Sequence, residues 1–386
     1  RDKVPFKINE SQNAERLFGG NLSISASQLE KFNLCRFSYF CNYGLNVRER
    51  LKAEINPMQY GTIVHYILER FFREYSKEQY SVMDKDELSK IFSTYISEYA
   101  AAHFGEVQTK QNSFMYRIKL ILENVLRLVK HTIDELTQSE FFVTDCELKI
   151  GEDVPSYTVV LPDGHKIAVC GSVDRVDIMQ KNGTTYLRVI DYKTGSKEFK
   201  LSDVLYGINL QMLLYLHSIE VSGSDRYGDI IPAGILYMPA TVPYISSDSL
   251  KSIDKLPDEL NKKLKMNGLL LKDTEIIHGM DKTDAATYIP VKIKAGEPVS
   301  STSLATLEEF GKIFQKVDML IAEMGKNIYN GNIEARPLKG GHDSCEYCPY
   351  DSVCAYRRSN PINCFSVDNK TVIEEITNEI NGKEEE

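Results

Sequence analysis

The stretch of residues 171–193 constrains the fold more than any other part of the sequence, because it predicts a β-hairpin. Two runs rich in β-branched and aromatic residues flank the dipeptide Asn182–Gly183, which is a strong hairpin signal. With this dipeptide in the two central positions of the turn, Asp174 lies opposite Asp191. Lys193 shares a face with Asp191, because side chains alternate along a strand.

The opposite face supports this register, since Asp177 then pairs with Arg188. Cross-strand partners lie roughly 4.5–5.5 Å apart at their β-carbons, and like charges there are destabilising. Asp174 and Asp191 on a half-buried sheet therefore need a cation, and Mg²⁺ or Mn²⁺ prefers such oxygen ligands. A lysine beside the metal, here Lys193, can orient a water or offset charge on a phosphate. The alternative is an ordinary hairpin whose aspartates face water.

Three motifs resemble those of the RecB-like group of PD-(D/E)XK nucleases. They are Gly171-x-Val-Asp174-Arg-x-Asp177, Asp191-Tyr-Lys193 and Gln211-x-x-x-Tyr215. The resemblance implies that Asp174 and Asp191 are the catalytic acids and Lys193 the catalytic lysine. Gln211 and Tyr215 are four residues apart on a helix expected to begin at Ser202 or Asp203, so they share one face. The resemblance implies that these two side chains position the substrate; the alternative is a polar edge on a packing helix.

The motif Gly61-x-x-x-His65 lies on a segment with Ile63, Ile67 and Phe71 at helical spacing. A histidine on such a face is more often a buried core residue than a ligand. The RecB-like motif changes this interpretation and implies that His65 binds the metal together with Asp174, Asp191 and the carbonyl of Tyr192. Glu147, on a strand expected over residues 141–150, is a further acid but belongs to none of these motifs.

The eight cysteines are unevenly placed, with three in the compact pattern Cys345-x-x-Cys348-x₅-Cys354. Such a cluster in an intracellular enzyme more often binds metal than forms disulfides. Spacing leaves the fourth ligand open, although zinc would accept Cys364, the nearest in sequence. The remaining candidates are Cys35, Cys41, Cys146 and Cys170.

The segment from Ser23 to Phe40 resembles the start of AddB-type and Cas4-type nuclease domains. The resemblance implies that Cys35 joins Cys345, Cys348 and Cys354 around a [4Fe–4S] cluster, which closes a very long loop of chain. Arg36 stands where the family usually has proline. The other four cysteines match no motif and are interpreted as small buried hydrophobic residues.

The order of the predicted elements indicates an α/β core. Helices are expected within 84–138, strands over 141–150, 157–161 and 231–238, and a long helix over 306–328. This order predicts a mixed sheet flanked by helices, as in the restriction-endonuclease-like fold, clasped by the four-cysteine site. The predicted divisions are an N-terminal segment over 1–55, a nuclease core over 56–330 with an insertion at about 241–299, the cysteine cluster over 331–364 and a tail over 365–386.

Composition restricts the function further. The net charge of −9 over 386 residues argues against a protein that coats DNA. No apolar run approaches the ~20 residues of a membrane helix, no signal peptide opens the chain, and a phosphate-binding GxxxxGK[ST] motif is absent. A cytoplasmic protein without membrane contact is expected.

The resemblance implies a deoxyribonuclease domain of an AddAB-type helicase–nuclease, partnered by an AddA-like subunit, that cuts single-stranded DNA at resected duplex ends. The phrase from Met266 to Asp281 is typical of AddB-type domains and not of the shorter Cas4-type proteins. Two alternatives remain: a stand-alone Cas4-like nuclease, and a non-catalytic module that binds DNA or a partner subunit.

Overall fold

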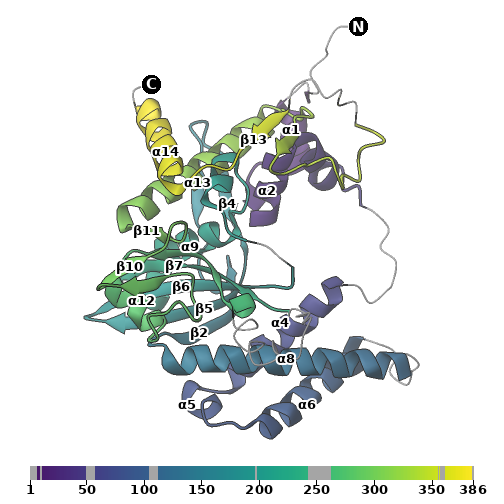
Figure 1. Cartoon of the computed structure of the whole chain (residues 1–386). Helices are drawn as coiled ribbons and strands as arrows, with labels where there is room; N and C mark the ends of the chain where they lie inside the picture. Colours follow the sequence, from purple (N-terminus) through teal and green to yellow (C-terminus); the bar gives the residue numbers. More distant parts are fainter. Residues whose placement is uncertain are drawn as a thin grey trace.

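A computed structural model describes residues 7–8, 11–48, 57–103, 112–195, 198–241, 262–354, 356 and 361–384. The centre of the described chain is a six-stranded mixed sheet in the order β11-β8-β7-β6-β5-β2 (Figure 1). Its strands are β2 (Phe142–Ile150), β5 (Gly171–Lys181), β6 (Thr184–Lys193), β7 (Ile230–Pro239), β8 (Asn267–Leu271) and β11 (Leu304–Ala305). Strands β6 and β7 are parallel and β5 and β6 antiparallel, so the predicted α/β class with a mixed sheet is confirmed.

Smaller sheets and helices surround this centre. The remaining strands are β1 (Leu22–Ile24), β3 (Thr158–Val160), β4 (Lys166–Val169), β9 (Lys292–Lys294), β10 (Glu297–Val299), β12 (Leu338–Gly340) and β13 (Ile362–Cys364). The helices are α1 (Ser11–Phe18), α2 (Ala26–Leu34), α3 (Arg36–Tyr39), α4 (Pro57–Glu74), α5 (Lys77–Tyr80), α6 (Lys85–His103), α8 (Asn112–Gln138), α9 (Gln211–Ser222), α10 (Ser224–Tyr227), α12 (Thr274–Met280), α13 (Leu307–Tyr329) and α14 (Asn369–Glu384). Figure 1 shows α5, α6 and α8 together below the sheet and α13 and α14 above it.

The β5–β6 hairpin forms in the predicted register. Its pairs include Val176 with Val189 and Asp177 with Arg188. Asn182 and Gly183 form the turn with φ angles of 52° and 85°, the two positive values of a type I′ turn. The regular ladder runs from the turn to the pair Arg175–Ile190, so Asp174 and Asp191 are the next residues at its open end.

The helix that carries Gln211 and Tyr215 begins later than expected. A short 3₁₀ helix, η2 (Leu201–Tyr206), comes first, and α9 starts only at Gln211. Between them Gly207 and Asn209 have φ angles of 69° and 60°. Because left-handed residues interrupt a right-handed helix, the predicted single helix is divided into two.

Two regions to which the sequence assigned little structure are ordered. Strand β8, from the predicted insertion, pairs with β7 inside the central sheet. Helix α14, from the predicted tail, packs on α13 and buries Val372 and Ile376 completely. The insertion and the tail therefore contribute to the core of the described chain.

Candidate functional site

The open end of the β5–β6 hairpin brings the predicted acids and the lysine together. The Oδ2 atom of Asp174 accepts a hydrogen bond of 2.8 Å from the backbone N–H of Tyr192. The Nζ atom of Lys193 lies 2.5 Å from Oδ2 of Asp191. The Asp191 side chain is only 4% exposed, so this lysine supplies a positive charge to a nearly buried carboxylate.

Helix α4 adds His65 to the site. The Nε2 atom of His65 lies 3.1 Å from the carbonyl oxygen of Tyr192, and Nδ1 lies 3.5 Å from Oδ2 of Asp174. The predicted ligands His65, Asp174 and the Tyr192 carbonyl therefore meet at one place, although they come from α4, β5 and β6.

The sequence analysis attached no role to Glu147, which the structure places in the same site. Its Oε1 atom lies 3.7 Å from Nδ1 of His65. Ligand atoms of His65, Glu147 and Asp174 all lie within 4.8 Å of one another, a spacing that would admit one metal ion. Asp191 is adjacent to this group but faces Lys193.

Two local features hold Glu147 in place. Its φ angle is 50°, a left-handed value that is unusual for a residue with a side chain. The hydroxyl of Ser172 on β5 donates a 2.7 Å hydrogen bond to its Oε2 atom. A backbone irregularity of this kind changes where a side chain points, and alternation along β2 alone does not predict it.

The electrostatics of the site show a surplus of negative charge. Burial, followed by the charge of Asp191, raises the pKa of Asp174 to about 7. Burial lowers the pKa of His65, but the hydrogen bond to Glu147 and the charge of Asp174 outweigh it and raise this pKa to about 9. Three carboxylates close together keep a proton or require a cation, so the donors present fit a hard divalent metal.

Gln211 and Tyr215 reach the site from α9, as predicted. The Oε1 atom of Gln211 accepts a 3.3 Å hydrogen bond from Nζ of Lys193. The ring of Tyr215 covers Gly171, where an added β-carbon would lie 2.5 Å from the Tyr215 hydroxyl. Gly171 of the first motif and Tyr215 of the last motif therefore contact each other, and a side chain at residue 171 would clash with the tyrosine ring.

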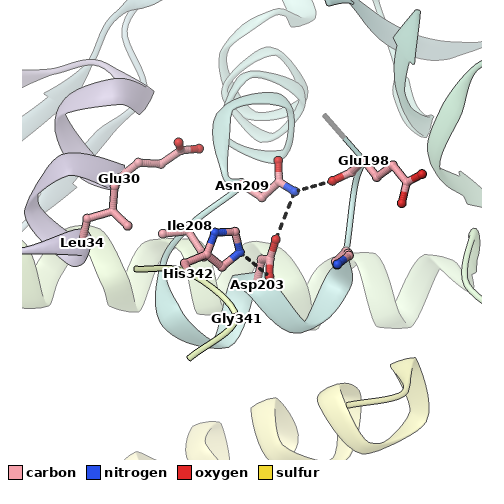
Figure 2. Close-up of a pocket in the computed structure, with 9 residues that line it drawn as sticks. Glu30, Leu34, Glu198, Asp203, Ile208, Asn209, Gly341 and His342 are labelled. Atoms are coloured by element: carbon pink, nitrogen blue, oxygen red, sulfur yellow. Dashed lines mark hydrogen bonds and ion pairs between the residues drawn. The ribbon is translucent and has the colours of Figure 1, made fainter. Parts of the chain in front are cut away.

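A separate cavity of about 390 Å³ lies beside the start of α9 (Figure 2). The carboxylate of Glu30 accepts a hydrogen bond from the backbone of Leu210, directly before Gln211. Asp203 in this cavity contacts His342 at 3.3 Å and also accepts a hydrogen bond from Asn209. The cavity is lined by three acids, Glu30, Glu198 and Asp203, and also by Lys200 and His342. The contact of Glu30 with Leu210 supports the position of α9.

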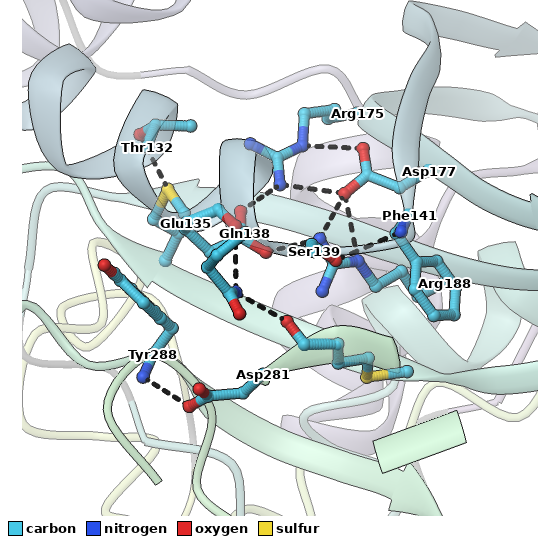
Figure 3. Close-up of polar contacts among 12 residues, drawn as sticks. Thr132, Glu135, Gln138, Ser139, Phe141, Arg175, Asp177, Arg188, Asp281 and Tyr288 are labelled. Atoms are coloured by element: carbon cyan, nitrogen blue, oxygen red, sulfur yellow. Dashed lines mark hydrogen bonds and ion pairs between the residues drawn. The ribbon is translucent and has the colours of Figure 1, made fainter. Parts of the chain in front are cut away.

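The other face of the hairpin holds a sealed ion network (Figure 3). The Nη2 atom of Arg188 lies 2.6 Å from Glu135 and 2.8 Å from Asp177. Arg175 contacts Asp177 at 2.8 Å and Glu135 at 3.5 Å. All four side chains are 0% exposed, so two positive and two negative charges balance inside the core and join α8 to the hairpin.

The structure also brings the predicted cysteines close to one another. A small buried cluster contains Cys35, Phe37, Cys41 and Tyr350, against which Phe40, Ala335, Cys348 and Cys354 pack. Burial raises the pKa of Cys354, and the neighbouring Cys348 and Cys345 raise it further. Thiolates are the usual ligands of iron–sulfur clusters and common ligands of structural zinc, and here these thiols lie between α3 and the C-terminal loop.

Comparisons with known proteins agree with this geometry. A family model described as the PD-(D/E)XK nuclease superfamily matches residues 23–355. The chain belongs to this superfamily. The match includes the hairpin, α4 and α9, and it confirms the resemblance drawn from the sequence motifs.

Curated relatives carry a more specific name. The chain is 33% identical over 360 residues to the B subunit of the ATP-dependent helicase/deoxyribonuclease of Clostridium acetobutylicum, covering 89% of this chain and 31% of the relative. Proteins of the same name from a Thermoanaerobacter species and from Clostridium kluyveri are 33% and 32% identical, covering 96% and 99% of this chain and 33% and 34% of the relatives. The chain thus spans about one third of the length of these relatives.

Among the helices of the described residues, none has both the length and the apolar character needed to cross a membrane.

Proposed function

We propose that this chain is a metal-dependent deoxyribonuclease domain of an AddAB-type helicase–nuclease, and that it hydrolyses phosphodiester bonds of single-stranded DNA during the resection of double-strand breaks. Membership of the nuclease superfamily and the name of the relatives support this proposal. An AddA-like subunit is the proposed partner.

One observation carries the proposal: three strands and two helices deliver oxygen, imidazole and amine groups to one small region. Asp174 contacts His65 at 3.5 Å, and Lys193 contacts both Asp191 and Gln211. A site that had lost catalysis would tolerate losing the lysine beside the nearly buried Asp191.

The donor set fits Mg²⁺ or Mn²⁺. His65, Asp174, Asp191 and the Tyr192 carbonyl would hold the ion, with Glu147 as a further ligand. When bound, the ion would polarise the phosphate and lower the pKa of a water molecule.

The chain's own residues supply the remaining functions. The positive charge of the Lys193 amine orients an attacking water or stabilises the negative charge that develops on the phosphate. Gln211 fixes the lysine amine through its 3.3 Å hydrogen bond. Tyr215, packed over Gly171, closes the end of the site and positions the strand to be cut.

The thiols of Cys35, Cys345, Cys348 and Cys354 are the proposed ligands of a [4Fe–4S] cluster, with no redox step in DNA cleavage. Such a centre would tie α3 to the C-terminal loop and restrict the unfolded chain, in the way that any cross-link over a long loop does. It therefore contributes stability to the nuclease core.

The test is cleavage of end-labelled single-stranded DNA with Mn²⁺, Mg²⁺ or a chelator. Asp191→Asn and Lys193→Ala are each expected to reduce cleavage by roughly a thousandfold, because each removes several kcal/mol of transition-state stabilisation. Glu69→Gln is the matched control, since Glu69 is an acid of α4 that pairs with Arg73 at 3.0 Å.

Thermal unfolding of each variant shows whether the fold is kept. Metal-dependent cleavage that survives in either site variant would refute the assignment. Strand binding without cleavage by the wild-type protein would favour the non-catalytic alternative, and cleavage that needs no partner subunit would favour a stand-alone nuclease.

A further inference from the structure

Cys41 lies in the cysteine site, although no motif points to it. It is 4% exposed and belongs to the buried cluster that includes Cys35 and Tyr350. Cys348 and Cys354 pack against this same cluster. The thiols of Cys35, Cys41, Cys348 and Cys354 therefore meet in one cluster, and Cys345 lies near enough to Cys354 to raise the pKa of that thiol.

The local backbone explains why the sequence spacing conceals this. Residues six apart do not share a face of a regular α-helix. Here Cys35 is extended, with φ −169° and ψ 118°, and acts as the cap between α2 and α3. Cys41 then lies in a π-helical turn, η1 (Phe40–Gly44). The break and the wide turn together bring the two thiols into one cluster, and π-turns are frequent at functional sites.

Cys345 has a different environment from Cys41. Its backbone N–H donates a 2.8 Å hydrogen bond to Asp343, and the amine of Lys339 contacts both Asp343 and the Cys345 thiol. Cys345 is half-buried and, unlike Cys41, is not among the residues of the buried cluster. Burial raises the pKa of Cys41, and Cys354, Cys348 and Cys35 raise it further, as expected for thiols that lie close together.

We propose that Cys41 is a reserve ligand: a fifth thiol that can take the place of Cys345 in holding the metal centre. This inference rests on the metal centre of the proposed function and not on nuclease activity. A [4Fe–4S] cluster is held by four thiolates, so the thiols of Cys41 and Cys345 are alternatives for the fourth position.

The exchange is balanced without a redox partner. One metal–sulfur bond to Cys345 breaks and one to Cys41 forms. The Cys41 thiol gives its proton to solvent, and the released Cys345 thiolate takes one up. The oxidation state of the centre does not change.

The experiment compares metal content in anaerobic preparations of the whole chain. The variants are wild type, Cys41→Ala, Cys345→Ala, the double variant of both, and a control double variant that combines Cys345→Ala with Cys364→Ala. Cys364 is equally buried but lies in a separate cluster with Ile208 and Leu338. Iron, acid-labile sulfide and zinc per chain are measured, together with the visible spectrum.

Cys41→Ala is expected to match wild type. Cys345→Ala and its control double variant are expected to keep about half or more of the centre, because four thiols remain. The Cys345→Ala/Cys41→Ala variant is expected to lose roughly tenfold, because only three thiols remain and weak metal sites release their ion.

Equal metal content in Cys345→Ala and in Cys345→Ala/Cys41→Ala would overturn the proposal, whether both keep the centre or both lose it. A wild-type protein without any metal would overturn the metal centre itself, and the reserve role with it. Thermal unfolding checks each fold, and Cys41→Val is a second apolar replacement if alanine leaves a destabilising cavity.

Discussion

The two faces of the β5–β6 hairpin both carry charged side chains, but the charges are balanced on one face and unbalanced on the other. On one face Arg175, Arg188, Asp177 and Glu135 neutralise one another inside the core. On the other face the carboxylates of Asp174, Asp191 and Glu147 outnumber the amine of Lys193 and the imidazole of His65, whose pKa is raised to about 9. The charges of the first face balance without a ligand, whereas the second face keeps a proton or takes up a cation to balance its carboxylates.

This difference shows how one element serves stability and chemistry together. The balanced face anchors the hairpin to α8 through contacts of 2.6–3.5 Å. Because the network is sealed in the core, Asp174, next to Arg175 on β5, and Asp191, three residues after Arg188 on β6, keep their positions despite their repulsion. The balanced face should thus respond to mutation by unfolding, and the unbalanced face by losing its metal.

The largest expected effect is on the balanced face. Arg188→Ala should lower the free energy of unfolding by about 3–5 kcal/mol, because it leaves two buried negative charges, those of Glu135 and Asp177, with Arg175 as a single positive partner. Urea unfolding followed by circular dichroism measures the change.

Lys130→Ala is the matched control, since Lys130 pairs with Asp134 on the same helix as Glu135 but is 61% exposed. It should cost less than about 1 kcal/mol. Similar losses in the two variants would show that the sealed network does not anchor the hairpin.

The next effect concerns the unbalanced face. Mn²⁺ at about a hundred times its dissociation constant should stabilise the wild-type protein by about 2.7 kcal/mol. Asp174→Asn should abolish this gain while leaving the metal-free protein folded, because it removes a ligand and a source of repulsion. Thermal unfolding with and without Mn²⁺ measures both quantities, and an undiminished gain in Asp174→Asn would place the ion elsewhere.

The hairpin was predictable because its information is local. The turn dipeptide and the pairing of Asp177 with Arg188 fix the register within 23 residues of sequence, and the alternation of side chains then separates the two faces. The structure places the motif residues His65, Gln211 and Tyr215 beside that hairpin, although they come from distant helices.

What the sequence did not predict depends on backbone exceptions. Glu147 reaches the site with a left-handed φ of 50°, and Cys41 reaches the cysteine site through a π-helical turn. The single helix predicted to carry Gln211 and Tyr215 is divided at Gly207 and Asn209. Regular periodicity cannot anticipate such positions, because they are departures from it that tertiary packing stabilises.

A third and smaller effect tests the unpredicted acid. Glu147→Gln should weaken Mn²⁺ binding by roughly tenfold, because a metal site usually loses this much with one supporting oxygen group. Isothermal titration calorimetry measures the affinity. Glu69→Gln is the control, since Glu69 and Glu147 are similarly exposed at 29% and 28%, and equal affinities in the two variants would remove Glu147 from the metal site.

The smallest effect separates orientation from ligation. Ser172→Ala removes the 2.7 Å hydrogen bond to Oε2 of Glu147 and keeps every proposed ligand. One hydrogen bond contributes about 0.5–1.5 kcal/mol, so Mn²⁺ affinity should fall only about threefold if this bond orients the carboxylate. Gln180→Ala, at an exposed position of the same strand, is the control for changes in strand stability.

In a Glu147→Gln background, Ser172→Ala should have no further effect on affinity, because the hydroxyl acts through the carboxylate. A full threefold loss in that background would mean that Ser172 contacts the metal site by another route and that the unbalanced face is held by more than its acids.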